Sequence, residues 1–172
     1  MTLLETAKKR YTVRNYQSKP VEKEKLLTIL EAGRVAPTAA NNQPYRLIVV
    51  QQKDGLEKLG KAANIYGAPL AILVCGDHDR AWKRPYDGKT SVDVDASIVA
   101  SHMMLQATEL DLGSVWIMFF KPDVVRNEFK LPENLEPIAI LALGYPNGAP
   151  ASPERHREQR FPLSAIVAYE QL

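Results

Sequence analysis

The chain has 172 residues, which fits one domain, and its 45% hydrophobic and 24% charged residues are typical of a folded globular protein. A formal net charge of only +2 excludes the strong basic excess of a dedicated nucleic-acid-binding domain. The single cysteine, Cys75, excludes an intramolecular disulfide. The sequence also shows no signal peptide after Met1 and no apolar run of membrane-spanning length, so we expect a cytoplasmic protein away from membranes.

Two helices are expected before residue 35. Thr2 and Glu5 form a T-x-x-E capping box, which predicts a short helix over Leu3–Lys9. A second helix begins near Pro20, because proline and acidic residues suit a first turn. Its apolar residues recur at helical spacing, and Gly33 indicates a close approach to another element.

The run Lys9–Tyr16 between these helices carries the first candidate site. If it is extended, alternate side chains share a face, so Arg10, Thr12 and Arg14 point one way, opposite to Tyr11 and Val13. Two guanidinium groups beside a hydroxyl suit a phosphate monoester. The simpler alternative is a solvated basic turn, because basic clusters are common on surfaces.

A loop with two prolines is the second candidate site. Ala36–Tyr45 is small and polar, so its backbone amides and the side chains of Thr38, Asn41 and Gln43 can approach a flat ligand. The alternative is an ordinary turn before the strand Arg46–Gln51, which is rich in β-branched residues.

The middle of the chain alternates between helix and strand. A helix from Asp54 to Ala63 precedes an apolar strand over Leu70–Cys75, whose lack of alternation predicts burial on both faces. Gly76–Thr90 is a long polar connection, either a lid or a loop docked by its aromatic residues. Ser91–Leu110 is a helix that is apolar nearly all round, which predicts burial and a subunit interface on one side.

The last third predicts two more strands and a tail. We expect a strand over Gly113–Phe120, a short helix through Phe129, a turn over Leu131–Pro137 and a buried strand over Ile138–Leu143. A polar stretch from 147 to 160 follows, and then an apolar end that could pack on another subunit.

Motifs for independent chemistry are missing. The sequence has no phosphate-binding glycine motif, no H-E-x-x-H, no C-x-x-C and no G-x-S-x-G. Three histidines far apart in sequence argue against a metal site, and Cys75 lies in an apolar strand where a thiol is inert. An anion clamp with small-residue loops instead suits a protein that lends its chemistry to a bound cofactor.

Four motifs in order carry a family resemblance: Arg10-x-Thr12-x-Arg14, Ala36–Tyr45, Leu112-Gly113-Ser114-x-Trp116-Ile117 and Ala142–Pro146. They resemble the flavin-dependent nitroreductase family over nearly the whole chain. The resemblance implies one α+β domain over 1–172, with a mainly antiparallel central sheet flanked by helices. It also implies a homodimer with FMN at the interface and the tail 147–172 packed on the partner.

The same resemblance assigns residues to FMN. It implies that the phosphate and ribityl chain are held by Arg10, Tyr11, Thr12, Arg14 and Arg160. It implies that the partner subunit approaches the flavin with Pro37, Thr38, Ala39 and Asn41. The turn at Met118 and Phe119 would bring backbone amides to the flavin ring, and no side chain need act as a catalytic acid or base.

Three features depart from the family pattern. Glycine is usual at the position of Asp111 and at Met118 or Phe119, so the pocket here is narrower or its turn differs. A lysine commonly stands where this chain has Glu158. We expect Glu158 to point away from the phosphate, or Arg157 to substitute for the lysine.

The expected activity is therefore transfer of hydride from NADH or NADPH through FMN to an electron-poor acceptor, such as a nitroaromatic or a quinone, with ping-pong kinetics. One alternative keeps the flavin but makes the protein a dehalogenase or a flavin-transforming enzyme. Another is a dimeric anion-binding module without enzymatic activity.

Overall fold

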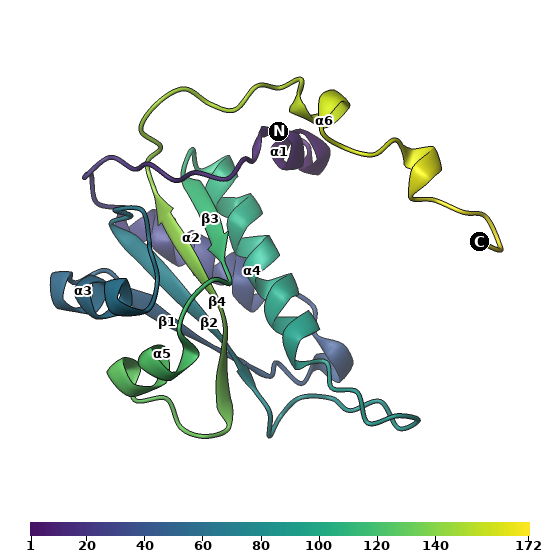
Figure 1. Cartoon of the computed structure of the whole chain (residues 1–172), viewed down its shortest axis with the longest axis horizontal. Coiled ribbons are helices and arrows are strands. Elements are labelled where there is room, and N and C mark those ends of the chain that lie inside the picture. Colours follow the sequence, from purple (N-terminus) through teal and green to yellow (C-terminus); the bar gives the residue numbers. More distant parts are fainter.

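A computed structural model describes all residues from 1 to 172, and four antiparallel strands form its single sheet (Figure 1). The strands are β1 (Tyr45–Val50), β2 (Leu70–Asp77), β3 (Gly113–Ile117) and β4 (Leu135–Gly144), in the order β1-β2-β4-β3. Every residue of β2 is buried, as its unbroken apolar sequence predicts. The predicted α+β class with an antiparallel central sheet is confirmed.

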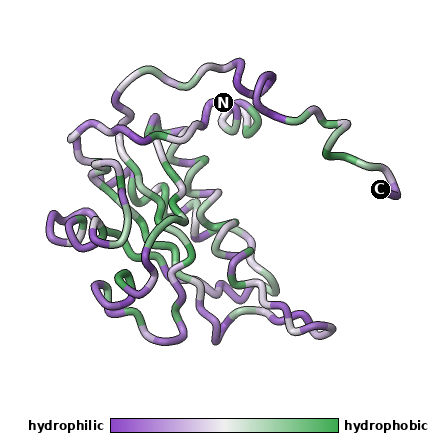
Figure 2. The backbone as a smooth tube through the Cα atoms, in the orientation of Figure 1, coloured by the Kyte–Doolittle hydropathy of each residue, from purple (hydrophilic) through white to green (hydrophobic).

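Helices cover both faces of the sheet. On one face lie α2 (Lys23–Arg34) and α4 (Val92–Glu109), and on the other lie α3 (Lys53–Ala62) and α5 (Pro122–Phe129) (Figure 1). Hydrophobic residues concentrate in the sheet between these helices (Figure 2). A β-carbon on Gly33 would lie 3.0 Å from Met103 Cγ, so the close approach expected at this glycine is between α2 and α4.

Two strand boundaries were predicted wrongly. β3 ends at Ile117 rather than Phe120, because the chain turns there and Lys121 N donates to Ala62 O on α3 at 3.1 Å. β4 begins at Leu135, inside the segment expected to be a turn. Pro137 lies at a β-bulge opposite Cys75, where a residue without an N–H is tolerated in a sheet.

The N-terminal segment is attached to the outer edge of β3. The helix α1 (Leu3–Lys9) has the predicted capping box. The chain then continues as an extended segment, the strap, over residues 10–16. Thr12 pairs with Ser114 as an isolated parallel bridge, and Val13 N donates to Ser114 O at 3.0 Å. Val13 is buried while Thr12 is exposed, so this part of the strap alternates as predicted.

The C-terminal segment leaves the body of the molecule. The short helix α6 (Arg155–Glu158) lies beside α1, and the chain then runs outward through η2 (Leu163–Ala165) (Figure 1). Residues 161–172 are all exposed, although they include several hydrophobic side chains (Figure 2). None of the helices combines the length and the hydropathy that crossing a membrane requires.

The long helix α4 is not covered on every side. Met103 and Val99 are fully buried, but Val94 is 54% exposed and His102 is exposed. One face of this helix therefore has no neighbour within the single chain, and the subunit interface expected on one side of it stays a prediction.

Candidate functional site

A basic cavity of about 390 Å³ lies where the end of α1 meets the C-terminal segment. It is lined by Arg10, Tyr11, Thr12, Ala151, Arg155, His156, Gln159 and Arg160. No carboxylate is among these residues, so their positive charges are not neutralised within the cavity. The structure therefore brings together four of the predicted residues, Arg10, Tyr11, Thr12 and Arg160, from opposite ends of the chain.

Arg10 lies close to the positive charges of Arg155 and Arg160 in this cavity. Burial is the main cause that lowers the pKa of Arg10, and the charges of Arg160 and Arg155 lower it further. Three guanidinium groups that repel one another are stabilised when an anion enters between them. Arginine forks and a hydroxyl are also the donors that fit phosphate oxygens, so the donor set fits the phosphate of a mononucleotide such as FMN.

Arg14 is not among the residues that line the basic cavity, so its predicted contact with FMN stays a prediction. The guanidinium carbon of Arg14 is 5.8 Å from the centre of the Tyr66 ring, and the side chain does not line the basic cavity. In an extended strap, the Cα atoms of residues four positions apart are separated by ~13 Å. Arg160 instead stands opposite Arg10.

Glu158 lies outside the basic cavity and pairs with a neighbouring arginine. Arg157 pairs with Glu154 at 3.0 Å and with Glu158 at 3.6 Å, and neither Arg157 nor Glu158 lines the basic cavity. Arg157 therefore does not take the place of the family's lysine. The additional positive charge at the cavity comes from Arg155, a residue that the sequence pattern did not indicate.

The loop with Pro37 forms a second, separate group. Pro37 is exposed, and η1 (Ala39–Asn41) follows Thr38. Ala40, Asn41 and Gln43 all have positive φ, between 50° and 55°, although none is glycine. Non-glycine residues in this region cost free energy and often lie at binding sites.

Hydrogen bonds hold this strained loop in place. Asp95 is 1% exposed, and its carboxylate accepts from Ala39 N at 2.9 Å and from the Ser91 hydroxyl at 2.7 Å. Gln43 N donates to Thr38 Oγ1 at 3.0 Å. No sequence motif indicated this role of Asp95, and the only local signal was an acidic residue in the first turn of a helix.

The basic cavity and this loop lie at opposite ends of α4. Asp95, in the first turn of α4, binds the loop, whereas Asp111, just beyond its last turn, pairs with Lys9 beside Arg10 at 2.6 Å. From Asp95 to its last residue, Glu109, the helix rises by ~21 Å. The two groups of predicted residues therefore do not form one pocket within a single chain.

Met118 and Phe119 lie where the chain leaves β3. Their side chains are 68% and 97% exposed, which is unusual for large hydrophobic residues. The backbone N–H of Phe119 makes no hydrogen bond within the chain, so it is free to donate to a ligand.

Asp111 occupies a backbone position that suits glycine. Asp111 has φ of 60°, a left-handed conformation that glycine adopts without steric cost. Here aspartate is retained with a salt bridge to Lys9, and that hydrogen bond is the main cause that lowers the pKa of Asp111.

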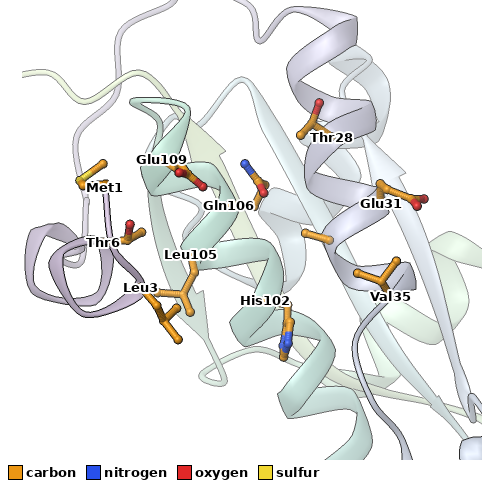
Figure 3. A pocket seen from close by; sticks show the side chains of 11 residues that line it. Met1, Leu3, Thr6, Thr28, Glu31, Val35, His102, Leu105, Gln106 and Glu109 are labelled. Atoms are coloured by element: carbon orange, nitrogen blue, oxygen red, sulfur yellow. The ribbon is translucent and has the colours of Figure 1, made fainter.

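A larger groove of about 580 Å³ lies between α1, α2 and α4 (Figure 3). Leu3, Val35, His102 and Leu105 are among the side chains that line it, and Leu3 and Val35 are 71% and 60% exposed. None of the predicted site residues lies in this groove, which continues the uncovered face of α4.

Comparison with known proteins identifies the family. The sequence profile of the nitroreductase family matches residues 7–65 and 57–145, which together cover most of the chain. The chain belongs to the nitroreductase family. A crystal structure of a nitroreductase family protein from Clostridium difficile 630 is 62% identical, with a TM-score of 0.98 over all of both chains.

Two other nitroreductase-family relatives have more informative names. An FMN-dependent nitroreductase from Clostridium difficile R20291 is 30% identical, with a TM-score of 0.79 over 98% of this chain and 99% of that one. An FMN reductase [NAD(P)H] from Bacillus subtilis is 29% identical over 90% of this chain and 68% of its own length.

Proposed function

We propose that this protein is an FMN-dependent oxidoreductase that uses NADH or NADPH to reduce an electron-poor acceptor such as a nitroaromatic or a quinone. The observation that carries the proposal is the basic cavity, which lacks any carboxylate, in a chain of the nitroreductase family. The names of the FMN-dependent nitroreductase and of the FMN reductase support both the flavin and the nicotinamide.

The chain's own residues would divide the task of holding the flavin. Arg10 and Arg160 would bind the phosphate from two sides, and Thr12 would donate a hydrogen bond between them. Arg14, ~13 Å farther along the strap, would contact the part of the ligand remote from the phosphate. The free N–H of Phe119 would donate to the ring system at the end of β3.

Bound FMN would supply the redox chemistry that no side chain of this protein offers. The nicotinamide and the acceptor would occupy the same place in turn, which gives ping-pong kinetics. We assign no side chain as an acid or base, since solvent can provide protons at an exposed site.

A homodimer would complete the site. The basic cavity and the Pro37–Gln43 loop lie at opposite ends of α4, so an antiparallel pairing of two α4 helices would bring the loop of one copy to the cavity of the other. The uncovered face of α4, the groove of Figure 3 and the exposed tail 161–172 all offer apolar surface for such pairing.

Spectroscopy tests the cofactor. We expect the protein to be yellow or to become so with FMN, and NADH added without air to bleach that colour. Replacing Arg10 with alanine should weaken FMN binding about 10- to 100-fold, the cost of charged hydrogen bonds. A matched control is Arg126→Gln on α5, where Arg126 Nη1 donates only to Pro132 O. A protein that is colourless as purified and does not bind added FMN would refute the proposal.

Sedimentation equilibrium tests the dimer. The full chain should sediment at twice its 19.2 kDa mass, and deletion of residues 161–172 should shift the equilibrium towards monomer. The deletion keeps Arg160, so FMN binding should weaken only to the extent that the dimer dissociates. A full chain that remains monomeric at all concentrations would contradict the shared site.

A further inference from the structure

Arg155 makes contacts that join the two ends of the chain. Its Nη2 donates to Lys8 O at 2.5 Å and to Arg10 O at 3.0 Å. Its Nη1 donates to Ser152 O at 2.7 Å and to Ala151 O at 3.3 Å. Both terminal nitrogens of the guanidinium group are therefore fully used by backbone carbonyls, and they bridge residues 145 positions apart.

The neighbouring residue reinforces this junction. His156 Nε2 lies 3.0 Å from Lys8 O, and it must act as the donor because a carbonyl only accepts. The carbonyls at the end of α1 have no partner inside the helix, so the side chains of α6 provide the partners that they lack. These are the contacts that fasten α6 to the rest of the molecule.

The junction determines where Arg160 lies. Within a single chain, residues 161–172 are exposed and do not fix the C-terminal segment, and Arg160 follows Arg155 by five residues. The same guanidinium that binds Arg10 O therefore holds the backbone of one wall of the basic cavity against the other.

We propose that Arg155 is a positioning residue for phosphate binding: it clamps the C-terminal segment to the end of α1 and thereby holds Arg160 opposite Arg10. The proposal rests on the proposed function, because it takes the phosphate of FMN as the ligand of the basic cavity. The clamp requires a planar fork with several donors, which a lysine ammonium cannot reproduce.

The test compares FMN with riboflavin, which lacks the phosphate, by quenching of flavin fluorescence. We expect Arg155→Ala to lower the preference for FMN over riboflavin about 10- to 100-fold, while riboflavin affinity stays within about twofold. Arg155→Lys keeps the charge but not the clamp, and it should be nearly as defective. Arg157→Ala is the matched control. It removes the same charge only two residues from Arg155, but the Arg157 side chain does not line the basic cavity.

Each outcome decides between explanations. Full recovery with lysine would show that only charge matters and would overturn the clamp. Equal loss of FMN and riboflavin, with a circular dichroism spectrum that shows lost structure, would also overturn it. Normal FMN preference in Arg155→Ala would refute the inference yet leave the proposed function intact, whereas a wild-type protein that does not bind FMN would refute the proposed function itself.

Discussion

Replacing Gly113 with alanine would test whether β3 sets the position of the cofactor-binding strap. A β-carbon at this position would lie 2.5 Å from Val13 Cγ2, 2.9 Å from Val13 Cβ and 3.0 Å from Pro146 Cγ. A rotamer change relieves the first contact but not the second, because Val13 Cβ is fixed to the backbone. The strap must therefore shift by about half an ångström or more to restore an ordinary contact.

The size of the effect follows from overpacking. Extra carbon atoms in a packed interior typically cost ~1–3 kcal/mol, and we expect Gly113→Ala to lower the free energy of unfolding in urea by that amount. FMN affinity should fall as well, because Val13 lies between Thr12 and Arg14. Gly60 on α3 is the control: nothing lies within 4 Å of its added β-carbon, so Gly60→Ala should stabilise the helix by ~0.5–1 kcal/mol.

A double-mutant cycle isolates the contact. A Val13→Ala background removes the Cγ contact but keeps Val13 Cβ, so Gly113→Ala should keep most of its cost there. A Gly113→Ala variant that unfolds at the wild-type urea concentration and binds FMN with wild-type affinity would show that β3 does not set the position of the strap.

Three further predictions concern buried polar groups. Asp95→Ala should lower the free energy of unfolding by ~2–3 kcal/mol and weaken FMN binding, because Ala39 N and Ser91 lose a charged acceptor; a urea titration with unchanged midpoint would contradict this. Tyr16→Phe should cost ~1–2 kcal/mol, since the Tyr16 hydroxyl donates to Val13 O at 2.9 Å, and thermal unfolding will measure it. Burial raises the pKa of the Cys75 thiol from an ordinary 9.0 to about 11. As pH rises, the unfolded chain therefore loses this proton before the folded chain does. The free energy of unfolding should decline between pH 9 and pH 11, by up to ~2 kcal/mol more in the wild type than in Cys75→Ala.

The sequence predicts the elements well where apolar residues are continuous. β2 and the middle of β4 are unbroken apolar runs, and burial on both faces leaves little alternative to a central strand. The ends of the strands were less predictable, because they depend on the neighbouring strands and helices with which they pair or pack. Pro137 reads locally as a turn residue, yet a bulge opposite β2 accommodates it within the sheet.

The candidate site was predictable only in part, for a similar reason. Arg10 and Thr12 belong to a local pattern, and the resemblance to the family added Arg160. Arg155 acts through carbonyls 145 and 147 residues away, which no local pattern encodes. Asp95 likewise acts on a loop 56 residues before it, and its sequence context is that of an ordinary first-turn residue.

The bridge between Thr12 and Ser114 has a consequence for how the folded protein stays separate from other sheets. β3 is an outer strand of the sheet, and an outer strand with free N–H and C=O groups is a template for unwanted pairing between molecules. The residues on either side of the bridge are those proposed to hold the flavin. Loss of the flavin would weaken the attachment of the strap to the edge of β3, so the apoprotein should aggregate sooner than the FMN-bound form.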